Sequence, residues 1–310
     1  MRAYRTGSVL TAFLCACLTA CQAPADLTQS SSSEPKRLPQ GAVKSRFDYN
    51  MAKVSCDPLG GGQPIYYNEG LAAELHALPS PSPTASPTGQ ASQPRNLAEI
   101  FAASQKVDVD LFFSQVNVPT RLFSSGFPSA TGELLRDPQN QILTEYFALR
   151  FKSILRLGSS DRSGLYQFAL LSDDGAVLKL DTDGKGLSSV VDNDGWHPSR
   201  FACGTEAVSL DTSSLIPLQL EYFQGPKYHI SLVLLWRELP LNATSAQLAD
   251  SACGMTNNDR WFDYSTNPPT PKTAWTGILS RGWKVLSHEN FVLPYEQPEN
   301  PCCPGCDIGV

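Results

Sequence analysis

Residues 165–195 read LYQFALLSDDGAVLKLDTDGKGLSSVVDNDG. Apolar side chains recur at every second position on both sides of an Asp-Gly turn: Tyr166, Phe168 and Leu170 before it, and Ala176, Leu178 and Leu180 after it. A period of two on each side of such a turn predicts a β-hairpin with one buried face. This stretch therefore favours an all-β fold.

The turn itself carries two adjacent carboxylates, Asp173 and Asp174. A β-turn needs one Asp or Asn at most to hydrogen-bond its own backbone. Two neighbouring carboxylates repel each other unless a cation or several hydrogen-bond donors offset the charge. Two interpretations follow from the spacing: an ordinary solvent-exposed turn, or a cation site.

The flanking sequence contains further strand-like segments in a fixed order. Residues 145–156 alternate between an apolar face and a more polar one, and Asp192-Asn193-Asp194-Gly195 is typical of a turn, with His197 shortly after it. Two later runs, 217–225 and 230–236, have the composition of strands, and the second ends in a Trp.

Taken together, residues 110–238 resemble the protective-antigen-fourteen domain family. Its signature is a strand, Ser-Asp-Asp-Gly, a strand ending in Asp-Gly, an Asp-Asn-Asp/Gly turn followed by His, a Glu-Tyr-Phe-Gln-type strand and a last strand ending in Trp. The family is a β-sandwich found in bacterial glycosidases, toxins and fungal adhesins. The resemblance implies an antiparallel β-sandwich over residues 108–239, with irregular, disulfide-linked termini.

The resemblance also implies a binding site. In sugar-binding members of the family, the Asp-Asp pair is joined by a cis peptide and holds a calcium ion that contacts sugar hydroxyls. Asp173 and Asp174 are then the expected calcium ligands and carbohydrate-binding residues. Calcium takes six to eight oxygen ligands, so more are needed. The position of a third ligand, an Asn in the fungal lectins, is occupied here by Gln224, and Tyr228 is the rough counterpart of a Trp near the sugar.

The N-terminus predicts export. Arg2 and Arg5 precede an apolar run, 9–20, that is too short to span a bilayer. The following Leu18-Thr19-Ala20-Cys21 resembles a lipoprotein signal-peptidase site, so residues 1–20 are expected to be removed and Cys21 to be lipidated. Gln22 rather than Asp after this Cys favours a bacterial outer-membrane location. A plain secretory signal and cleavage before Cys17 are the alternatives.

Charge and motifs exclude several classes of function. The net charge of −6 becomes −8 once Arg2 and Arg5 leave with the signal, and no contiguous basic patch is present, which argues against nucleic acid as a partner. The four histidines occur in no zincin pattern, and no nucleophile elbow, P-loop or dinucleotide fingerprint is found. We therefore expect a protein that is not an enzyme.

The chain outside the predicted sandwich divides into four parts. Residues 21–50 are expected to be a disordered tether and residues 51–107 an irregular segment with a Pro/Ser-rich spacer at 79–94. A short helix is predicted at 97–104. Residues 240–310 form a C-terminal extension that contains cysteines.

The cysteines are consistent with an oxidising compartment. Six remain after Cys15 and Cys17 leave with the signal and Cys21 is lipidated: Cys56, Cys203, Cys253, Cys302, Cys303 and Cys306. An even number favours three disulfides over a metal site, although the spacing alone leaves the pairing open. Because the termini of the fungal relatives are stapled together, we expect at least one disulfide between Cys56 and the C-terminal group. Cys203 and Cys253 are then expected to pair with each other.

These features lead us to expect an exported lipoprotein whose sandwich binds a glycan or cell-surface polysaccharide without catalysis. The membrane is a second partner, through the N-terminal lipid. A structural or protein-interaction lipoprotein of the envelope, and an accessory module of an enzyme complex, are the alternatives.

The lipidation of Cys21 has a direct test. Cys21→Ala removes the thiol that accepts the diacylglycerol, so we expect the variant to accumulate as precursor or as soluble material. Mass spectrometry of the mature wild-type N-terminus should find acylated Cys21. An unmodified N-terminus at another residue would show that the prediction is wrong.

Overall fold

The structure is a computed structural model, and it describes residues 50–60, 66–79, 96–226, 228–296 and 300–303. All of these belong to one compact unit, 45–310. The expected signal peptide 1–20, the lipidated Cys21, nearly all of the tether and of the spacer, and Cys306 lie outside the described residues.

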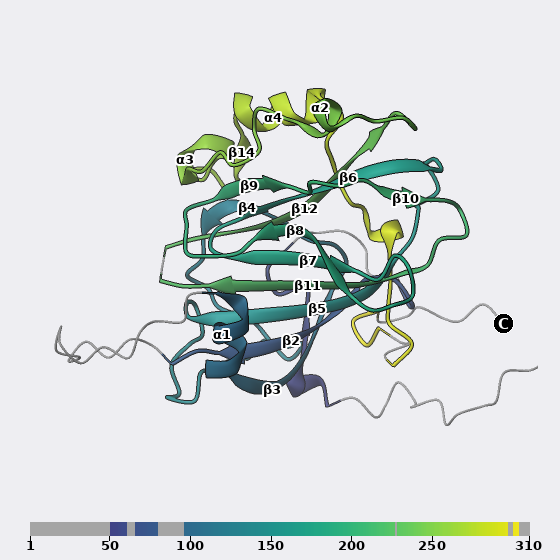
Figure 1. The fold of residues 1–310 in the computed structure, drawn as a ribbon. Coiled ribbons are helices and arrows are strands. Elements are labelled where there is room, and N and C mark those ends of the chain that lie inside the picture. The colour runs from purple at the N-terminus through teal and green to yellow at the C-terminus, as the bar shows by residue number, and fades with distance from the viewer. Residues whose placement is uncertain (1–49, 61–65, 80–95, 227, 297–299, 304–310) are drawn as a thin grey trace, which may run out of the picture. The chain divides into compact units, whose positions relative to one another are not determined.

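The described residues form a β-sandwich of two main sheets (Figure 1). The larger sheet has eight strands in the order β1-β3-β2-β5-β11-β7-β8, with β16 also paired to β5, and only the β1–β3 pair is parallel. Its strands are β1 (Val54–Cys56), β2 (Leu71–Ala77), β3 (Gln105–Phe113), β5 (Phe147–Leu155), β7 (Ala176–Leu180), β8 (Ser188–Asn193), β11 (Ile216–Gln224) and β16 (Phe291–Val292).

The smaller sheet has six strands, in which β6 and β12 are central. The order β10-β6-β12-β15 is extended by β9, which pairs with β6, and by β4, which pairs with β12. The strands are β4 (Asn117–Leu122), β6 (Gly164–Ser172), β9 (Arg200–Cys203), β10 (Val208–Leu210), β12 (His229–Leu239) and β15 (Lys284–Val285).

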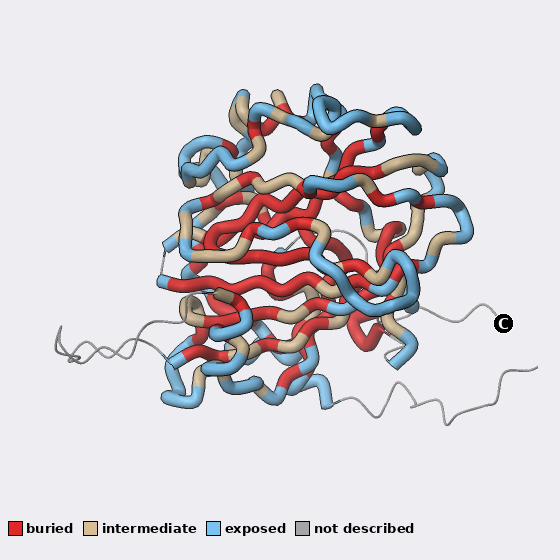
Figure 2. Tube along the Cα trace, viewed as in Figure 1, coloured by how far each residue is buried: buried red, intermediate tan, exposed pale blue. Residues whose placement is uncertain are grey.

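The core lies between the two sheets and follows the alternation seen in the sequence. Alternate residues of β5, Phe147, Leu149 and Phe151, point into it from the larger sheet, and Tyr166 and Phe168 of β6 from the smaller one. Figure 2 shows these strands as a continuous buried layer. The predicted all-β, antiparallel sandwich is confirmed.

The predicted hairpin at residues 165–181 is wrong. β6 belongs to the smaller sheet and β7 to the larger one, and each pairs with other strands: β6 with β12, β9 and β10, and β7 with β11 and β8. The turn that contains Asp173 and Asp174 therefore carries the chain from one sheet to the other. A period of two says which face of a strand is buried, but not which strand it pairs with.

The smaller sheet is buried on both faces, because the C-terminal extension covers its outer side. Three short helices, α2 (Ser245–Leu248), α3 (Asn258–Trp261) and α4 (Thr273–Ser280), lie over this face, together with the two-stranded β13 (Phe262–Asp263) and β14 (Thr270–Pro271) (Figure 1). Ala169 and Leu171, which alternate with the core residues of β6, pack against Trp261 and Trp283 there. No helix in the described ranges is long and apolar enough to cross a membrane.

The expectation that residues 51–107 are irregular is also wrong. After a 3-10 turn at Met51–Lys53, β1 adds to the edge of the larger sheet, and β2 lies inside that sheet, between β3 and β5. The sandwich thus begins before residue 108, and it ends beyond 239, since β15 and β16 also join its sheets. The predicted short helix is present as α1 (Leu97–Ala103), and a second 3-10 turn lies at His288–Asn290.

Two disulfides connect the extensions to the sandwich. Cys56 in β1 is bonded to Cys302, and Cys203 in β9 is bonded to Cys253 in the C-terminal extension. The predicted link from Cys56 to the C-terminal group of cysteines and the predicted Cys203–Cys253 pair are both confirmed. Cys303 is also disulfide-bonded.

The two disulfides close loops of different length, which predicts unequal contributions to stability. In the chain-entropy model, the separations of 246 and 50 residues correspond to roughly 5 and 4 kcal/mol. We expect Cys56→Ala/Cys302→Ala to lower the free energy of unfolding more than Cys203→Ala/Cys253→Ala does, as measured by urea denaturation. The reverse order would mean that native-state contacts, rather than loop length, decide the effect.

Candidate functional site

The turn between β6 and β7 is fixed to both sheets and to the loop after β8. The backbone N–H of Asp173 donates to Ser231 O of β12 at 2.9 Å, and that of Asp174 donates to His197 O at 2.9 Å. Gly175 O accepts from the N–H of Phe223 in β11. A Cβ at Gly175 would lie 2.4 Å from the Phe223 ring, so this close approach requires glycine.

The peptide between Asp173 and Asp174 is trans, in contrast to the cis peptide that the family resemblance implies. Within the described ranges, the one cis peptide joins Asn267 to Pro268. Asp174 instead adopts a φ of 58°, in the left-handed region. Asp tolerates this region better than most residues, because its short side chain can hydrogen-bond locally.

Both carboxylates are buried, each with 6% of its surface exposed. Asp173 accepts hydrogen bonds from the backbone and hydroxyl of Ser199, with the hydroxyl at 3.4 Å, and from the side chain of Asn258. The Ser199 hydroxyl is itself 3.0 Å from the hydroxyl of Thr120. The groups that donate hydrogen bonds to Asp173 are therefore polar but uncharged.

Among the described residues, the Asp174 carboxylate accepts hydrogen bonds from backbone amides. Its Oδ1 accepts from the N–H of His197 at 3.2 Å, and its Oδ2 accepts from the N–H of Gly225 at 2.8 Å. The backbone of His197 therefore makes two hydrogen bonds with Asp174: its N–H donates to the carboxylate, and its C=O accepts from the Asp174 N–H. These bonds fix the carboxylate at the end of the sandwich where β11 leaves the larger sheet.

No Lys, Arg or His among the described residues forms an ion pair with either carboxylate. Burial and, to a lesser extent, the neighbouring Asp174 charge together raise the pKa of Asp173 to about 8, against the hydrogen bonds from Ser199 and Asn258. Burial also raises the pKa of Asp174 to about 6, against the amides of Gly225 and His197. The pair thus holds negative charge only at a cost, which a bound cation would offset.

The other two predicted site residues, Gln224 and Tyr228, are not brought together as ligands in the structure, because Gln224 is buried and Tyr228 is exposed. Gln224 is buried, and its Oε1 accepts a hydrogen bond from the Tyr222 hydroxyl at 2.6 Å, so this oxygen is engaged within the core. The neighbouring Gly225 amide, not the Gln224 side chain, is the group that reaches Asp174. Tyr228 lies on the following turn with 71% of its surface exposed.

Two residues at this site, Trp196 and Asn258, were not predicted from the sequence. Trp196 covers Gly225, where a Cβ would lie 2.1 Å from the indole ring, and it is 38% exposed. Its place directly after the Asp-Asn-Asp-Gly turn was a usable signal. Asn258 comes from α3 in the C-terminal extension, where no pattern pointed to the Asp turn.

The predicted turn after β8 holds the Asp pair and α1 in place through side-chain hydrogen bonds. The Asn193 side chain is buried and donates to the Ser172 hydroxyl at 2.7 Å, one residue before Asp173. Asp194 accepts from the backbone N–H of Leu97, at 3.0 and 3.1 Å, and so caps the first turn of α1. This loop therefore joins the Asp pair to the helix on the larger sheet.

The donor set has the chemistry of a hard-cation site. Carboxylate and hydroxyl oxygens are the ligands that calcium prefers, and Asp173 with Asp174 and Ser199 presents them together. A third acidic or metal-binding side chain is not part of it, since the described residues contain no group of three or more His, Cys, Asp or Glu that could hold a metal ion.

Comparison with known proteins gives similarities of fold. No family model matches the chain's sequence, and no curated protein matches it. Among solved structures, the chain is similar to the PA14 domain of the antifreeze protein MpAFP, with 14% identity, a TM-score of 0.40, and coverage of 60% of this chain and 93% of that one. PA14 is the protective-antigen-fourteen domain that the sequence resembles.

The chain is also similar to two adhesin domains from Candida glabrata. The A domain of epithelial adhesin 9, in complex with Galβ1-4GlcNAc, has 15% identity and a TM-score of 0.37, over 62% of this chain and 92% of that one. The A domain of epithelial adhesin 6, in complex with Galβ1-3GlcNAc, has the same identity and TM-score, over 71% and 96%. Similarities at this level concern the fold, so a function has to be argued from the chain's own residues.

The raised pKa values predict how stability depends on pH. The folded protein binds protons on Asp173 and Asp174 that the unfolded chain, with Asp pKa values of about 3.9, releases. Without calcium, the contribution of this pair to the free energy of unfolding should therefore fall as the pH rises from about 4 to about 8.

Asp173→Asn removes this penalty, so its stability relative to wild type should rise between pH 5 and pH 8 in urea denaturation with a chelator. Asp183→Asn, at an exposed position, is the matched control and should follow wild type. A constant difference between Asp173→Asn and wild type across this range would contradict the assignment.

Proposed function

We propose that this protein binds a glycan without catalysis, through the end of the sandwich that carries Asp173 and Asp174. The observation that supports this most is the pair of buried, adjacent carboxylates without an ionic partner among the described residues. Such a pair destabilises the fold unless its negative charge is offset. A bound cation would offset this charge, carboxylate oxygens are suitable ligands for it, and the cation could also contact a ligand.

Asp173 and Asp174 are the residues that would hold calcium. Bound there, the ion would supply positive charge to the pair and open coordination positions for vicinal sugar hydroxyls. Gln224 does not fit as a third ligand, because its oxygen accepts from Tyr222. The hydroxyl of Ser199, which already contacts Asp173, is the better placed oxygen.

Trp196 and Tyr228 are the proposed sugar-contacting side chains. Both are aromatic and partly or largely exposed, at 38% and 71%, and Trp196 packs over the same Gly225 whose amide binds Asp174. An aromatic face beside a polar anchor is a common arrangement in ligand sites, since it contributes apolar contact while the polar group sets orientation. The adhesin domains with a similar fold were solved with galactose-containing glycans.

The proposed place of action is the bacterial cell envelope. The signal sequence and the Cys21 box support a lipid anchor, with Gln22 favouring the outer membrane. A protein partner is the second candidate, because Leu122, 51% exposed, lies beside His229 on the neighbouring strand and so adjoins the Tyr228 turn.

Calcium and glycan binding can be tested on one set of variants. Isothermal titration of the chelated protein with calcium should give a signal, and calcium at 100 times its Kd should stabilise the fold by about 2.7 kcal/mol. Asp173→Asn should lose both effects, whereas the exposed Asp183→Asn should keep them.

A glycan array run with calcium and with chelator then tests the ligand. Binding that requires calcium and is lost in both Asp173→Asn and Trp196→Ala would support the proposal. Absence of calcium binding at millimolar concentration would overturn the metal site and favour the protein partner.

A further inference from the structure

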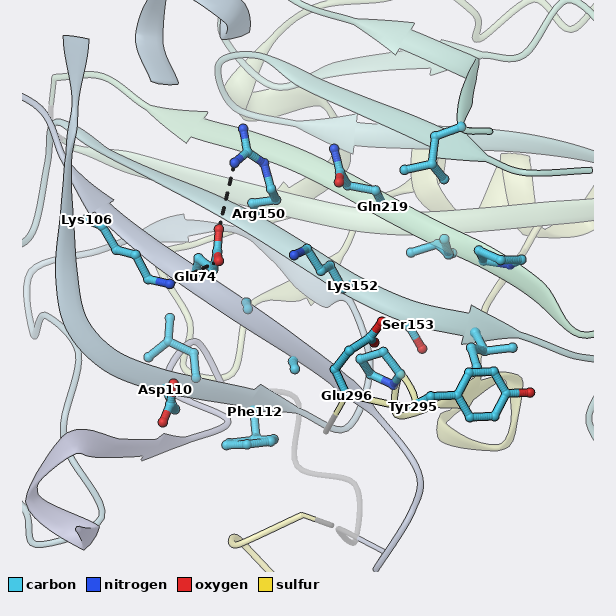
Figure 3. A pocket seen from close by; sticks show the side chains of 18 residues that line it. Glu74, Lys106, Asp110, Phe112, Arg150, Lys152, Ser153, Gln219, Tyr295 and Glu296 are labelled. Atoms are coloured by element: carbon cyan, nitrogen blue, oxygen red, sulfur yellow. Dashed lines mark hydrogen bonds and ion pairs between the residues drawn. The ribbon is translucent and has the colours of Figure 1, made fainter. Parts of the chain in front are cut away.

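A groove of about 590 Å³ lies on the outer face of the larger sheet (Figure 3), and neither Asp173 nor Asp174 lines it. Its floor is formed by β3, β2, β5 and β11, and one wall by residues 294–296 of the C-terminal segment. Toward the Asp pair, α1 covers the same face of the sheet, packing Ile100 against Ala148 and Phe223. The groove and the Asp pair are therefore separate features of the molecule.

A ladder of alternating charges crosses the sheet at the groove. Lys106 on β3 is paired with Glu74 on β2 at 3.0 Å, and Glu74 lies 3.7 Å from Arg150 on β5, as the dashed line in Figure 3 marks. Arg150 in turn pairs with Glu221 on β11 at 2.9 Å, and Glu221 with Lys179 on β7 at 2.6 Å. Each charged group of this ladder is thus held in position by its neighbours before any ligand binds.

A second row of side chains on the groove floor has fewer ion-pair and hydrogen-bond partners. Lys152 is exposed and lies directly opposite Gln219 on the neighbouring strand, and it forms no ion pair with any residue in the described part of the chain. The Gln219 amide nitrogen donates to Glu221, and the Gln219 side chain lines the groove. Tyr295 stands on the wall, and 80% of its surface is exposed. Figure 3 shows Lys152 between Glu74 and this wall.

We propose that this groove is a second carbohydrate site, which takes a segment of a neutral oligosaccharide or polysaccharide. The charged side chains that line it balance, since Lys106, Arg150 and Lys152 face Glu74, Asp110 and Glu296. A balanced set of fixed donors and acceptors suits a ligand with many hydroxyl groups and no net charge, because little has to reorganise on binding. Tyr295 adds an aromatic face for a sugar ring.

The dimensions of the groove favour a short run of sugar units rather than a monosaccharide. Four neighbouring strands span about 14 Å at roughly 4.7–4.9 Å per interval. The volume also falls within the range of about 300–1,000 Å³ that is usual for ligand sites. This site needs no metal, because its polar groups already carry both donors and acceptors.

Affinity gel electrophoresis of the full chain tests the proposal. The gels contain dextran, mannan, galactan or a β-glucan, with polygalacturonate as an acidic comparison, and a chelator is present throughout to exclude a calcium-dependent contribution from the Asp pair. We expect at least one neutral polysaccharide to retard the protein. Lys152→Ala and Tyr295→Ala should each weaken that retardation by at least about fivefold, a loss typical of one aromatic or hydrogen-bonding contact.

Two variants serve as controls. Asp183→Asn and Leu241→Ala should bind like wild type in this assay, because both residues are exposed and neither lines the groove or belongs to the Asp pair. Retardation by none of the neutral polysaccharides, retardation by polygalacturonate alone, or wild-type binding by Lys152→Ala and Tyr295→Ala would each overturn the second site. None of these outcomes would affect the calcium-dependent site.

Discussion

Two carboxylates are held inside this protein at the point where the chain passes from one sheet to the other. Burying charge is costly, and only hydrogen bonds among the described residues compensate for it: backbone amides at Asp174, and Ser199 with Asn258 at Asp173. The surrounding structure is arranged around this turn. Gly175 and Gly225 are glycines because Phe223 and Trp196 come too close for a side chain.

The C-terminal extension is part of the sandwich rather than an addition to it. It buries the outer face of the smaller sheet under Trp261 and Trp283, and the Cys203–Cys253 disulfide joins it to β9. By the same packing, α3 brings Asn258 to Asp173. The stability of the smaller sheet and the geometry of the Asp pair therefore depend on the same segment, so a change that loosens the extension should affect both.

Sequence patterns predicted the strands and the core better than the pairing and the site. Alternation identified the inward residues of β5 and β6, because burial of one strand face follows a local pattern. The family resemblance predicted that a disulfide links Cys56 to the C-terminal cysteines, but it did not say which of them is the partner. The predicted pairing of β6 with β7 was wrong, because alternation carries no information on which strand is a neighbour. Asn258 and the Arg150 ladder could not be found, since they arise from contacts between segments remote in sequence.

The most direct test of the central claim is the ionisation of the pair itself. Carboxyl 13C NMR titration of Asp173 and Asp174 should, with chelator, give pKa values raised to about 8 and about 6. With calcium, both should fall below the ordinary Asp value of about 3.9, because the cation favours the charged form. Ordinary pKa values that calcium leaves unchanged would contradict a buried cation site and reduce the pair to a structural turn.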